Sequence, residues 1–178
     1  MRKKLIKSVF RVLYYSIGIR LPKSNAKISL GSKKVRALFA RGFCEYVGRD
    51  VNIQKGAVIA PDLIIGNNSG IGLNCKLEGG VKIGNDVMMG PDVLMYTVNH
   101  KHDSLETPMR LQGKENIRPI VIEDDVWIGA RVIILPGVTI SQGCIIGAGS
   151  VVTKSFPPYS IIAGNPARIV KNRLSSES

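Results

Sequence analysis

Cysteine is scarce in this chain and is not arranged for crosslinking. Cys44, Cys75 and Cys144 are odd in number and widely spaced, which argues against a disulfide framework. The absence of a C-x-x-C pair argues against a cysteine-based metal site. Cys75 and Cys144 coincide with inward positions of the repeat described below, so we predict that they are small core residues.

Aromatic residues are also few, at 6% of the 178 residues, whereas Gly, Val and Ile are abundant. This balance favours short β-branched strands with tight corners over a helical bundle. The length allows one sizeable domain, and the 44% share of hydrophobic residues is typical of a globular chain.

Long uncharged apolar runs are missing from the N-terminal stretch MRKKLIKSVFRVLYYSIGIRLPKS, residues 1–24. Arg11 and Arg20 interrupt it and no cleavage motif follows, so we expect neither a signal peptide nor a membrane span. The apolar residues Leu5, Ile6, Val9, Leu13 and Ile17 have helical spacing. We predict a basic amphipathic helix that ends near Pro22 and packs on its own domain or a partner subunit, or contacts an anionic membrane.

Acidic residues are outnumbered, and the formal net charge is +12. Such a charge serves solubility or the binding of an anionic ligand or surface. We expect no nucleic-acid partner.

A six-residue repeat occupies most of the chain. Its aliphatic positions run Val47, Ile53, Ile59, Ile65, Ile71, Leu77, Ile83, Met89 and Met95, then Ile122, Ile128, Ile134, Ile140, Ile146 and Val152. A period of six fits no α-helix, but it suits a short strand plus a corner. Three such sides close one coil, and stacked coils bury a ladder of aliphatic side chains. A β-sandwich would instead show period two and hairpin signals.

The repeat is interrupted once. The step from Met95 to Ile122 is not a multiple of six, so the residues between them include an insertion that leaves the coil and re-enters it. We place this loop at residues 99–119; it is polar and contains Pro108 and Pro119. It also holds both histidines of the chain, His100 and His102.

From Val47 to Lys171 the chain resembles the hexapeptide-repeat acyltransferases, and especially the sugar O-acetyltransferases. The stretches that carry the resemblance are IGNDVMMGPDVLMYTVNH, IEDDVWIGARVIILPGVTI and IGAGSVVTKSFPPYSIIAGNPARIV. The resemblance implies an all-β fold, a left-handed parallel β-helix with an N-terminal helical segment and a protruding loop. We divide the chain into a helical segment 1–24, a connecting and capping segment 25–46, the β-helix 47–157, and a CoA-contacting tail 158–178.

The resemblance assigns the catalytic base to His100, since the family carries its base in an N-H segment at the start of the loop. His102 does not match and is expected to be a loop or metal-contact residue without catalytic duty. Asp92, Asp103 and a backbone carbonyl are the candidates for orienting the His100 ring. The resemblance aligns Asn74 with a sugar-contacting asparagine, although a corner ladder residue is an equal interpretation, and Trp127 is expected to flank the site.

The resemblance also implies acetyl-CoA as co-substrate, with no metal. It maps CoA contacts onto six residues: Ala130, Ala148, Thr153, Lys154, Arg168 and Lys171. The alanines can act through backbone groups and small size, and the three cations can pair with CoA phosphates. The sequence therefore predicts an acetyl-CoA-dependent O-acetyltransferase acting on a sugar hydroxyl, in surface polysaccharide biosynthesis.

Three alternative functions share parts of this pattern. An N-acetyltransferase acting on an amino-sugar would share the same features. A non-catalytic scaffold would not explain a histidine at the loop root. The γ-type carbonic anhydrases, which share the prism fold, need three histidines, and this chain has two. We further expect a homotrimer with sites between subunits, a cytoplasmic location, and peripheral contact with an anionic membrane.

Overall fold

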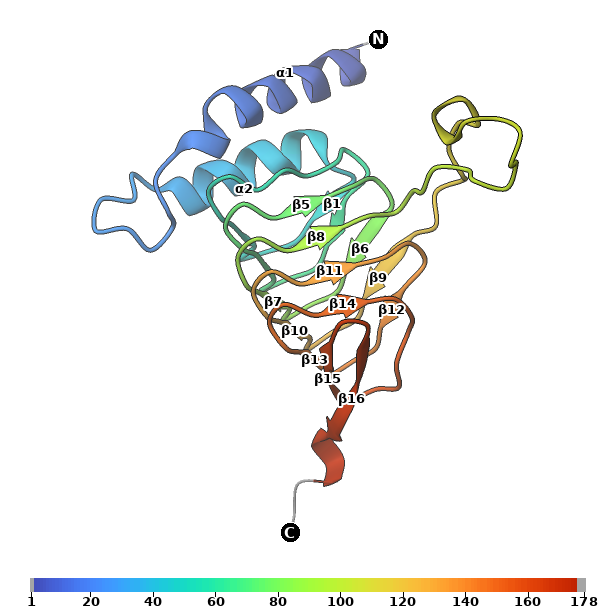
Figure 1. The fold of residues 1–178 in the computed structure, drawn as a ribbon. Helices are drawn as coiled ribbons and strands as arrows, with labels where there is room; N and C mark the ends of the chain where they lie inside the picture. Colours follow the sequence, from blue (N-terminus) through green and yellow to red (C-terminus); the bar gives the residue numbers. More distant parts are fainter. Residues whose placement is uncertain (1, 176–178) are drawn as a thin grey trace.

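A parallel β-helix lies beneath two N-terminal helices in the computed structural model, which describes residues 2–175 (Figure 1). The helices are α1 (Arg2–Ser16), η1 (Gly18–Arg20), α2 (Ser32–Phe43), η2 (Met109–Leu111) and η3 (Arg173–Ser175). The strands before the loop are β1 (Tyr46–Val47), β2 (Asn52–Ile53), β3 (Ile64–Ile65), β4 (Gly70–Ile71), β5 (Lys76–Leu77), β6 (Val81–Ile83), β7 (Met88–Met89) and β8 (Leu94–Met95). The strands after it are β9 (Ile120–Ile122), β10 (Trp127–Ile128), β11 (Ile133–Ile134), β12 (Thr139–Ile140), β13 (Ile145–Ile146), β14 (Val151–Val152), β15 (Ser160–Gly164) and β16 (Ala167–Asn172).

The strands stack into three sides of a prism. The first side is β1-β3-β6-β9-β12, the second combines β2-β4 with β7-β10-β13-β15-β16, and the third is β5-β8-β11-β14. Partners in neighbouring coils are three hexads apart, as in Tyr46 with Ile64. Lys82 pairs with Val121 across the break, so the coil that contains the break is longer than the others. The break therefore adds a loop without disturbing the stacking of the coils.

The hydrophobic core is the stack of aliphatic side chains that the six-residue repeat predicts. Every aliphatic position of the repeat is buried, from 0% exposed at Ile53 to 9% at Met89. Cys75 and Cys144 are buried among these residues as predicted, and Cys44 is buried as well. A strand of two residues can form because its inward side chain joins a continuous apolar column and its backbone bonds to the coils on both sides.

The corners of the coil depend on left-handed backbone conformations. Along the edge between the second and third sides, φ is positive at Asn74 (54°), Asp92 (59°) and Arg131 (57°). Asparagine and aspartate tolerate this region better than most residues. A Cβ on Gly72 would lie 1.9 Å from the carbonyl oxygen of Gly90 in the next coil, so this corner requires glycine.

The N-terminal helices cover the open end of the first coil. The Tyr14 hydroxyl donates to the carbonyl of Ala57 (2.7 Å), and the Tyr15 hydroxyl donates to the carbonyl of Ile59 (2.6 Å). The Tyr15 hydroxyl also accepts from the Ile59 N–H (3.1 Å). These bonds occupy backbone groups that the first coil would otherwise expose at an unpaired edge. The helical layer is therefore a cap on the prism.

The helix boundaries differ from the sequence prediction in two ways. The first α-helix ends at Ser16, and the chain continues as the short η1 to Arg20, before Pro22. A second helix, α2, lies in the segment 25–46, which was predicted as a connecting and capping segment without a helix, and it packs through Ala37, Ala40 and Phe43. The α1 residues that pack are also different, because Phe10 and Tyr14 face the interior while Leu5 and Val9 remain exposed.

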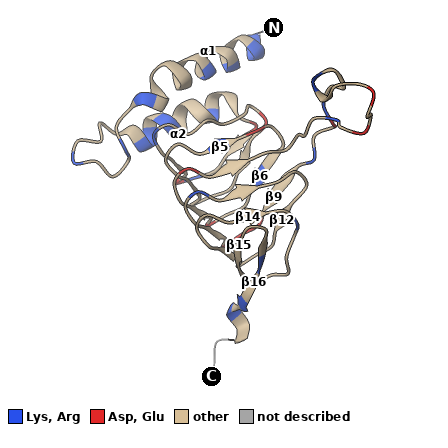
Figure 2. Cartoon of the chain, viewed as in Figure 1, with Lys and Arg blue, Asp and Glu red and all other residues tan. Residues whose placement is uncertain are grey.

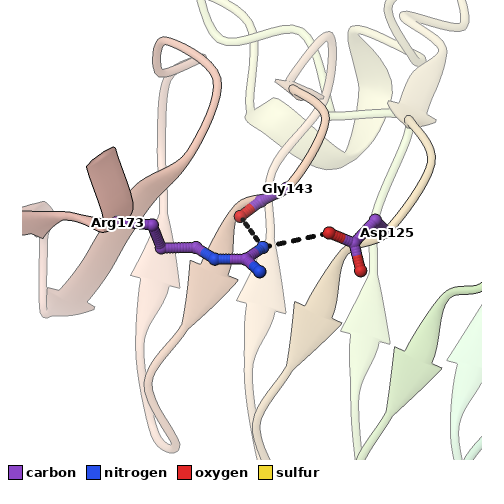
Figure 3. A network of polar contacts seen from close by, with 3 residues as sticks. All are labelled: Asp125, Gly143 and Arg173. Atoms are coloured by element: carbon purple, nitrogen blue, oxygen red, sulfur yellow. Dashed lines mark hydrogen bonds and ion pairs between the residues drawn. The ribbon is translucent and has the colours of Figure 1, made fainter. Parts of the chain in front are cut away.

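The C-terminal hairpin closes the other end. Strand β15 joins the second side in parallel with β13, and β16 returns antiparallel to β15. Figure 3 shows how the end of β16 is tied back, since the Arg173 guanidinium contacts the Asp125 carboxylate at 3.1 Å and the Gly143 carbonyl at 2.7 Å. The exposed ion pair contributes little to the stability of the fold by itself. The two contacts of Arg173 nevertheless hold the end of β16, the strand that carries Arg168 and Lys171, against the coil.

We predict that the three thiols of the folded protein resist alkylation. Burial raises the pKa of Cys44 to about 12 and that of Cys75 to about 11. At pH 8 the reactive thiolate is therefore scarce in the folded state. Iodoacetamide labelling of Cys44 and Cys75 at pH 8 should be at least ~100-fold slower than in the chain unfolded in urea, because a free thiol has a pKa near ~8.5. Burial also raises the pKa of Cys144, so its labelling should be slowed as well. Rapid labelling of the folded protein, measured by mass spectrometry, would contradict the buried placement.

The raised pKa values of the thiols also determine how the stability of the folded state depends on pH. A folded-state pKa above the unfolded value means that the folded state holds the proton more tightly. This stabilisation is complete below the unfolded thiol pKa of ~8.5 and is lost as the pH rises through the folded values.

Candidate active site

The protruding loop leaves the prism between β8 and β9, at the edge between the third and first sides (Figure 1). His100 lies at the root of this loop, where it bridges to Lys114. The chain leaves the coil after β8, and Thr97 is the last buried residue before the loop. The Thr97 hydroxyl donates to the Gly79 carbonyl (2.6 Å), and its N–H donates to the Glu78 carboxylate (3.1 Å). These bonds tie the residues just before His100 to the coil above.

The returning arm of the loop closes the root. The Arg118 N–H donates to the Thr97 carbonyl (2.9 Å), and the Glu115 N–H donates to the Asn99 carbonyl (2.9 Å). His100 itself forms an antiparallel bridge with Lys114. The backbone of His100 is therefore held on both sides, while the loop beyond it projects away from the prism. A general base benefits from such a fixed backbone and an accessible side chain.

A pocket of about 420 Å³ opens beside His100. It is lined by Glu78, Gly79, Thr97, Val98, His100, Lys114 and Ile117. The imidazole is exposed, and within residues 2–175 no hydrogen bond to its ring nitrogens is formed. Glu78 and Lys114, residues of opposite charge, line the same space, so the pocket can hold a polar acceptor.

Sequence reasoning missed Glu78 and Lys114. Glu78 lies one coil before Tyr96, which leads into the loop that carries His100. The length of one coil could therefore have indicated that Glu78 lies near the site. Lys114 lies in the loop, where the repeat gives no information.

The other candidate polar residues near the loop have separate surroundings. His102 is exposed, and its Nδ1 lies 3.3 Å from the His100 carbonyl oxygen. Asp103 is exposed in the loop. Asp92 lies on the edge between the second and third sides, where its carboxylate accepts a hydrogen bond from the Asn74 amide (3.3 Å). Within one protomer, Asp92 is therefore a partner of Asn74 and not of His100.

Three predicted contact residues share that other edge. Asn74, Ala130 and Ala148 lie at corresponding corners between the second and third sides. A Cβ on Gly90 would lie 2.7 Å from the Ala130 nitrogen, and one on Gly129 would lie 2.6 Å from the Ala148 nitrogen. The backbone at these corners is packed coil on coil and the alanine side chains are short. The edge is thus a narrow surface along which an extended ligand can approach the backbone.

The basic candidates lie near the C-terminal end of the prism. Thr153 and Lys154 follow β14, and the Lys154 ammonium lies 5.8 Å from the centre of the Phe156 ring. Arg168 and Lys171 are exposed on β16. Exposed ammonium and guanidinium groups at one end of a coil can bind phosphates. Across residues 2–175 no cluster of three or more His, Cys, Asp and Glu side chains is placed to hold a metal ion.

Trp127 lies on the outside of the second side, paired with Met88 in the coil above. Both are largely exposed, Trp127 at 51% and Met88 at 62%. In the free protomer this part of the prism is therefore an uncovered apolar strip.

The candidate residues of one protomer do not converge on one point. His100 lies on the edge between the third and first sides, and Asn74, Ala130 and Ala148 lie on the edge between the second and third sides. The whole width of the third side separates the two groups. A site that uses both groups needs a second copy of the chain to bring them together.

Comparison with known proteins identifies the repeat. The family model described as "Bacterial transferase hexapeptide (six repeats)" matches residues 119–154, and the one described as "Hexapeptide repeat of succinyl-transferase" matches residues 62–90. The chain therefore contains hexapeptide repeats in both of these stretches. The resemblance to hexapeptide-repeat acyltransferases seen in the sequence is confirmed.

Solved structures of two proteins extend the likeness to nearly the whole length of this chain. A hexapeptide-repeat acetyltransferase of Vibrio cholerae superposes with a TM-score of 0.76 at 29% identity, covering 97% of this chain and 93% of that one. The same Vibrio protein has been solved in complex with acetyl-CoA (TM-score 0.54, 26% identity, 93% and 87% covered). A maltose O-acetyltransferase of Clostridium difficile superposes with a TM-score of 0.64 at 26% identity, covering 97% and 88%. The predicted fold class, an all-β left-handed parallel β-helix, is confirmed.

The curated relatives match a smaller part of this chain than the solved structures do. A candidate acetyltransferase of Schizosaccharomyces pombe is 48% identical over 91 residues, which is 51% of this chain and 42% of that protein. The hexapeptide-repeat protein spans about half the length of the curated relatives that it matches.

Proposed function

We propose that this hexapeptide-repeat protein is an acetyl-CoA-dependent O-acetyltransferase that acetylates a saccharide hydroxyl. The observation that carries the proposal is the placement of His100, exposed beside a pocket at the root of the single insertion in the coil. Support for the donor comes from the acetyl-CoA complex of the Vibrio protein, and support for the acceptor comes from the maltose O-acetyltransferase with the same fold.

The chemistry follows from the groups present. The neutral imidazole of His100 takes the proton of the acceptor hydroxyl as its oxygen attacks the thioester carbonyl carbon. The tetrahedral intermediate that results carries a negative oxygen, which backbone N–H groups can stabilise. The carbon–sulfur bond then breaks, the acetyl ester remains on the acceptor, and the imidazolium returns the proton to the CoA sulfur.

The pantetheine arm of CoA would lie along the Ala130 and Ala148 edge of one protomer, where Arg168 and Lys171 would pair with CoA phosphates. Lys154 follows β14 on the edge that also carries His100, so it would reach a CoA phosphate from the neighbouring protomer. Asn74 would contact the acceptor and Trp127 would flank it. Acetyl-CoA is an intracellular donor, so we place the enzyme in the cytoplasm, with surface polysaccharide biosynthesis as its role.

The proposal is tested by an acetyl-CoA turnover assay with detection of released thiol across a panel of acceptors. The three buried cysteines should give a low background in such an assay. We expect thiol release that depends on a sugar with free hydroxyl groups and yields a base-labile ester. Release that depends only on an amino-sugar, with a stable amide as product, would assign N-acetylation instead. Absence of acceptor-dependent release with either class would remove the enzymatic proposal.

We further propose a homotrimer whose active sites lie between subunits. The separation of His100 from Ala148 on two edges of one protomer supports it, as does the exposed strip of Met88 and Trp127.

Subunit complementation tests the shared site. The His100→Ala variant lacks the base, and the Ala148→Trp variant blocks the Ala130 and Ala148 edge along which the pantetheine arm would lie. Each variant alone should be inactive. Unfolding and refolding an equal mixture should restore roughly a quarter of wild-type activity, since a random quarter of interfaces pairs an intact base with an intact groove. Zero recovery together with sedimentation of an active wild-type monomer would contradict the trimer.

A further inference from the structure

The charge of this protein is concentrated in the part of the chain that precedes the coil, from the N-terminus to Cys44. This part contains twelve of the 25 Lys and Arg residues and none of the 13 Asp and Glu residues. The thirteen basic residues that follow are balanced by the thirteen acidic ones, so the whole net charge of +12 lies in the N-terminal part. Figure 2 shows this division, with blue and no red on α1 and α2 and both colours on the coil.

Helix α1 has two apolar faces, and only one of them is used. Phe10 and Tyr14 point into the cap, where their rings contact Phe39 and Phe43. Leu5, Val9 and Val12 follow one another at helical spacing on another face and are 67%, 50% and 65% exposed. We call these three residues the outer stripe. An isolated exposed leucine needs no explanation, but an aligned stripe on a helix does.

The position of α1 leaves this stripe accessible. Helix α2 lies between α1 and the coil, so α1 is the outermost layer at one end of the prism, and the C-terminal hairpin is at the other end (Figure 1). Arg2, Lys3 and Lys4 are all exposed in the first turn of the same helix. Among residues 2–175 no helix has the length and apolar character needed to cross a membrane.

We propose that the outer stripe of α1 and its basic neighbours dock on an anionic lipid surface. A helix with an apolar face and basic flanks can lie in the interface of a membrane, with the apolar side chains among the lipid tails and the cations at the headgroups. The charge distribution favours an anionic lipid surface over other binding partners. A second copy of the same layer would bring two uniformly basic surfaces together with no acidic partner, which is unfavourable. A nucleic acid would use the cations but not the stripe.

The cap and the membrane contact are compatible because they use different faces of α1. Removal of the whole helix would also remove the Tyr14 and Tyr15 bonds to the coil and destabilise the protein. Point substitutions on the outer face avoid this complication.

Vesicle flotation with the full chain tests the proposal. Vesicles of phosphatidylglycerol and phosphatidylcholine in equal amounts, and vesicles of phosphatidylcholine alone, are compared at low and high salt. The wild type should float with the anionic vesicles at low salt and be released at high salt. The triple variant Arg2→Gln, Lys3→Gln, Lys4→Gln should bind on the order of 100-fold more weakly, since each basic residue contributes roughly fivefold near an anionic leaflet.

Two further variants separate the contributions of the outer stripe and of the basic charge to vesicle binding. The variant Leu5→Ser, Val9→Ser, Val12→Ser keeps every charge and should also lose binding, because the stripe is removed. The variant Arg49→Gln, Lys55→Gln, Lys82→Gln removes the same charge from exposed positions on the coil and should bind like the wild type. All variants should keep the unfolding temperature and the acetyl-CoA turnover of the wild type, so this test is independent of the proposed reaction.

Several outcomes would overturn the proposal. One is equal loss of binding in the coil control, which would indicate a general charge effect. Another is failure of the wild type to float with anionic vesicles at low salt. A change in sedimentation of the stripe variant without any vesicle binding would assign the stripe to a second copy of the chain. Binding to duplex DNA in preference to vesicles, unaffected by the serine substitutions, would assign the cations to nucleic acid.

Discussion

Replacement of His100 by alanine is expected to lower kcat by about two to four orders of magnitude, the usual cost of losing a general base. The acceptor hydroxyl would then have to lose its proton to water as it attacks. The side chain is exposed, so the folded structure should persist, and the unfolding temperature should match that of the wild type. The comparison is made on kcat from thiol release at saturating acetyl-CoA.

His102→Ala is the matched control, since it removes the other imidazole of the same loop. The Nδ1 atom of His102 lies 3.3 Å from the carbonyl oxygen of His100 and the residue is exposed, so its loss should change kcat by less than ~10-fold. Equal activity of the two variants would remove His100 from the mechanism.

Replacement of Arg36 by methionine is expected to destabilise the protein by about 3–5 kcal/mol. Arg36 is 0% exposed, and its guanidinium donates to the carbonyls of Ile53, Leu21 and Pro22 and to the hydroxyls of Ser24 and Ser32. Burial lowers the pKa of Arg36 from its usual range, because the charged form is desolvated. Methionine fills similar space but leaves several buried acceptors without a donor, and each costs about 1–3 kcal/mol.

Arg41→Met provides the comparison on the same helix. The Arg41 side chain is exposed although it donates to the Gly48 carbonyl (2.7 Å), and its loss should cost about 1 kcal/mol. Urea unfolding of the wild type and both variants measures the difference. An Arg36 variant within about 1 kcal/mol of the wild type would show that the guanidinium does not hold the cap on the first coil.

The coil could be predicted in detail because its pattern is local. Each aliphatic residue, such as Ile65 or Ile128, recurs every sixth position and is buried in the structure. The break at His100 followed from the same arithmetic, since the insertion shifts the phase of the repeat. The edge that Asn74 shares with Ala130 and Ala148 could have been found in the same way, from the length of one coil and the length of the insertion.

A capping segment was predicted at residues 25–46, but the residues that hold the cap could not be predicted, because they depend on contacts without sequence periodicity. Arg36 lies in a segment rich in basic residues and has the sequence context of a surface residue, yet it is fully buried. Gly42 weakens the helical signal of α2, but the ring of Phe10 occupies the space where its side chain would be. The long-range partners of these residues, not their neighbours in the chain, form the second helix and bury its guanidinium.

A crystal structure of the protein with bound CoA tests both the shared site and the role of His100, because it locates the reacting sulfur. We expect CoA between two protomers, with its pantetheine arm along the Ala130 and Ala148 edge of one. Its sulfur should lie within roughly 4 Å of the His100 imidazole of the other. CoA bound within a single protomer, or with its sulfur on a surface remote from the loop, would contradict both the shared site and the role of His100.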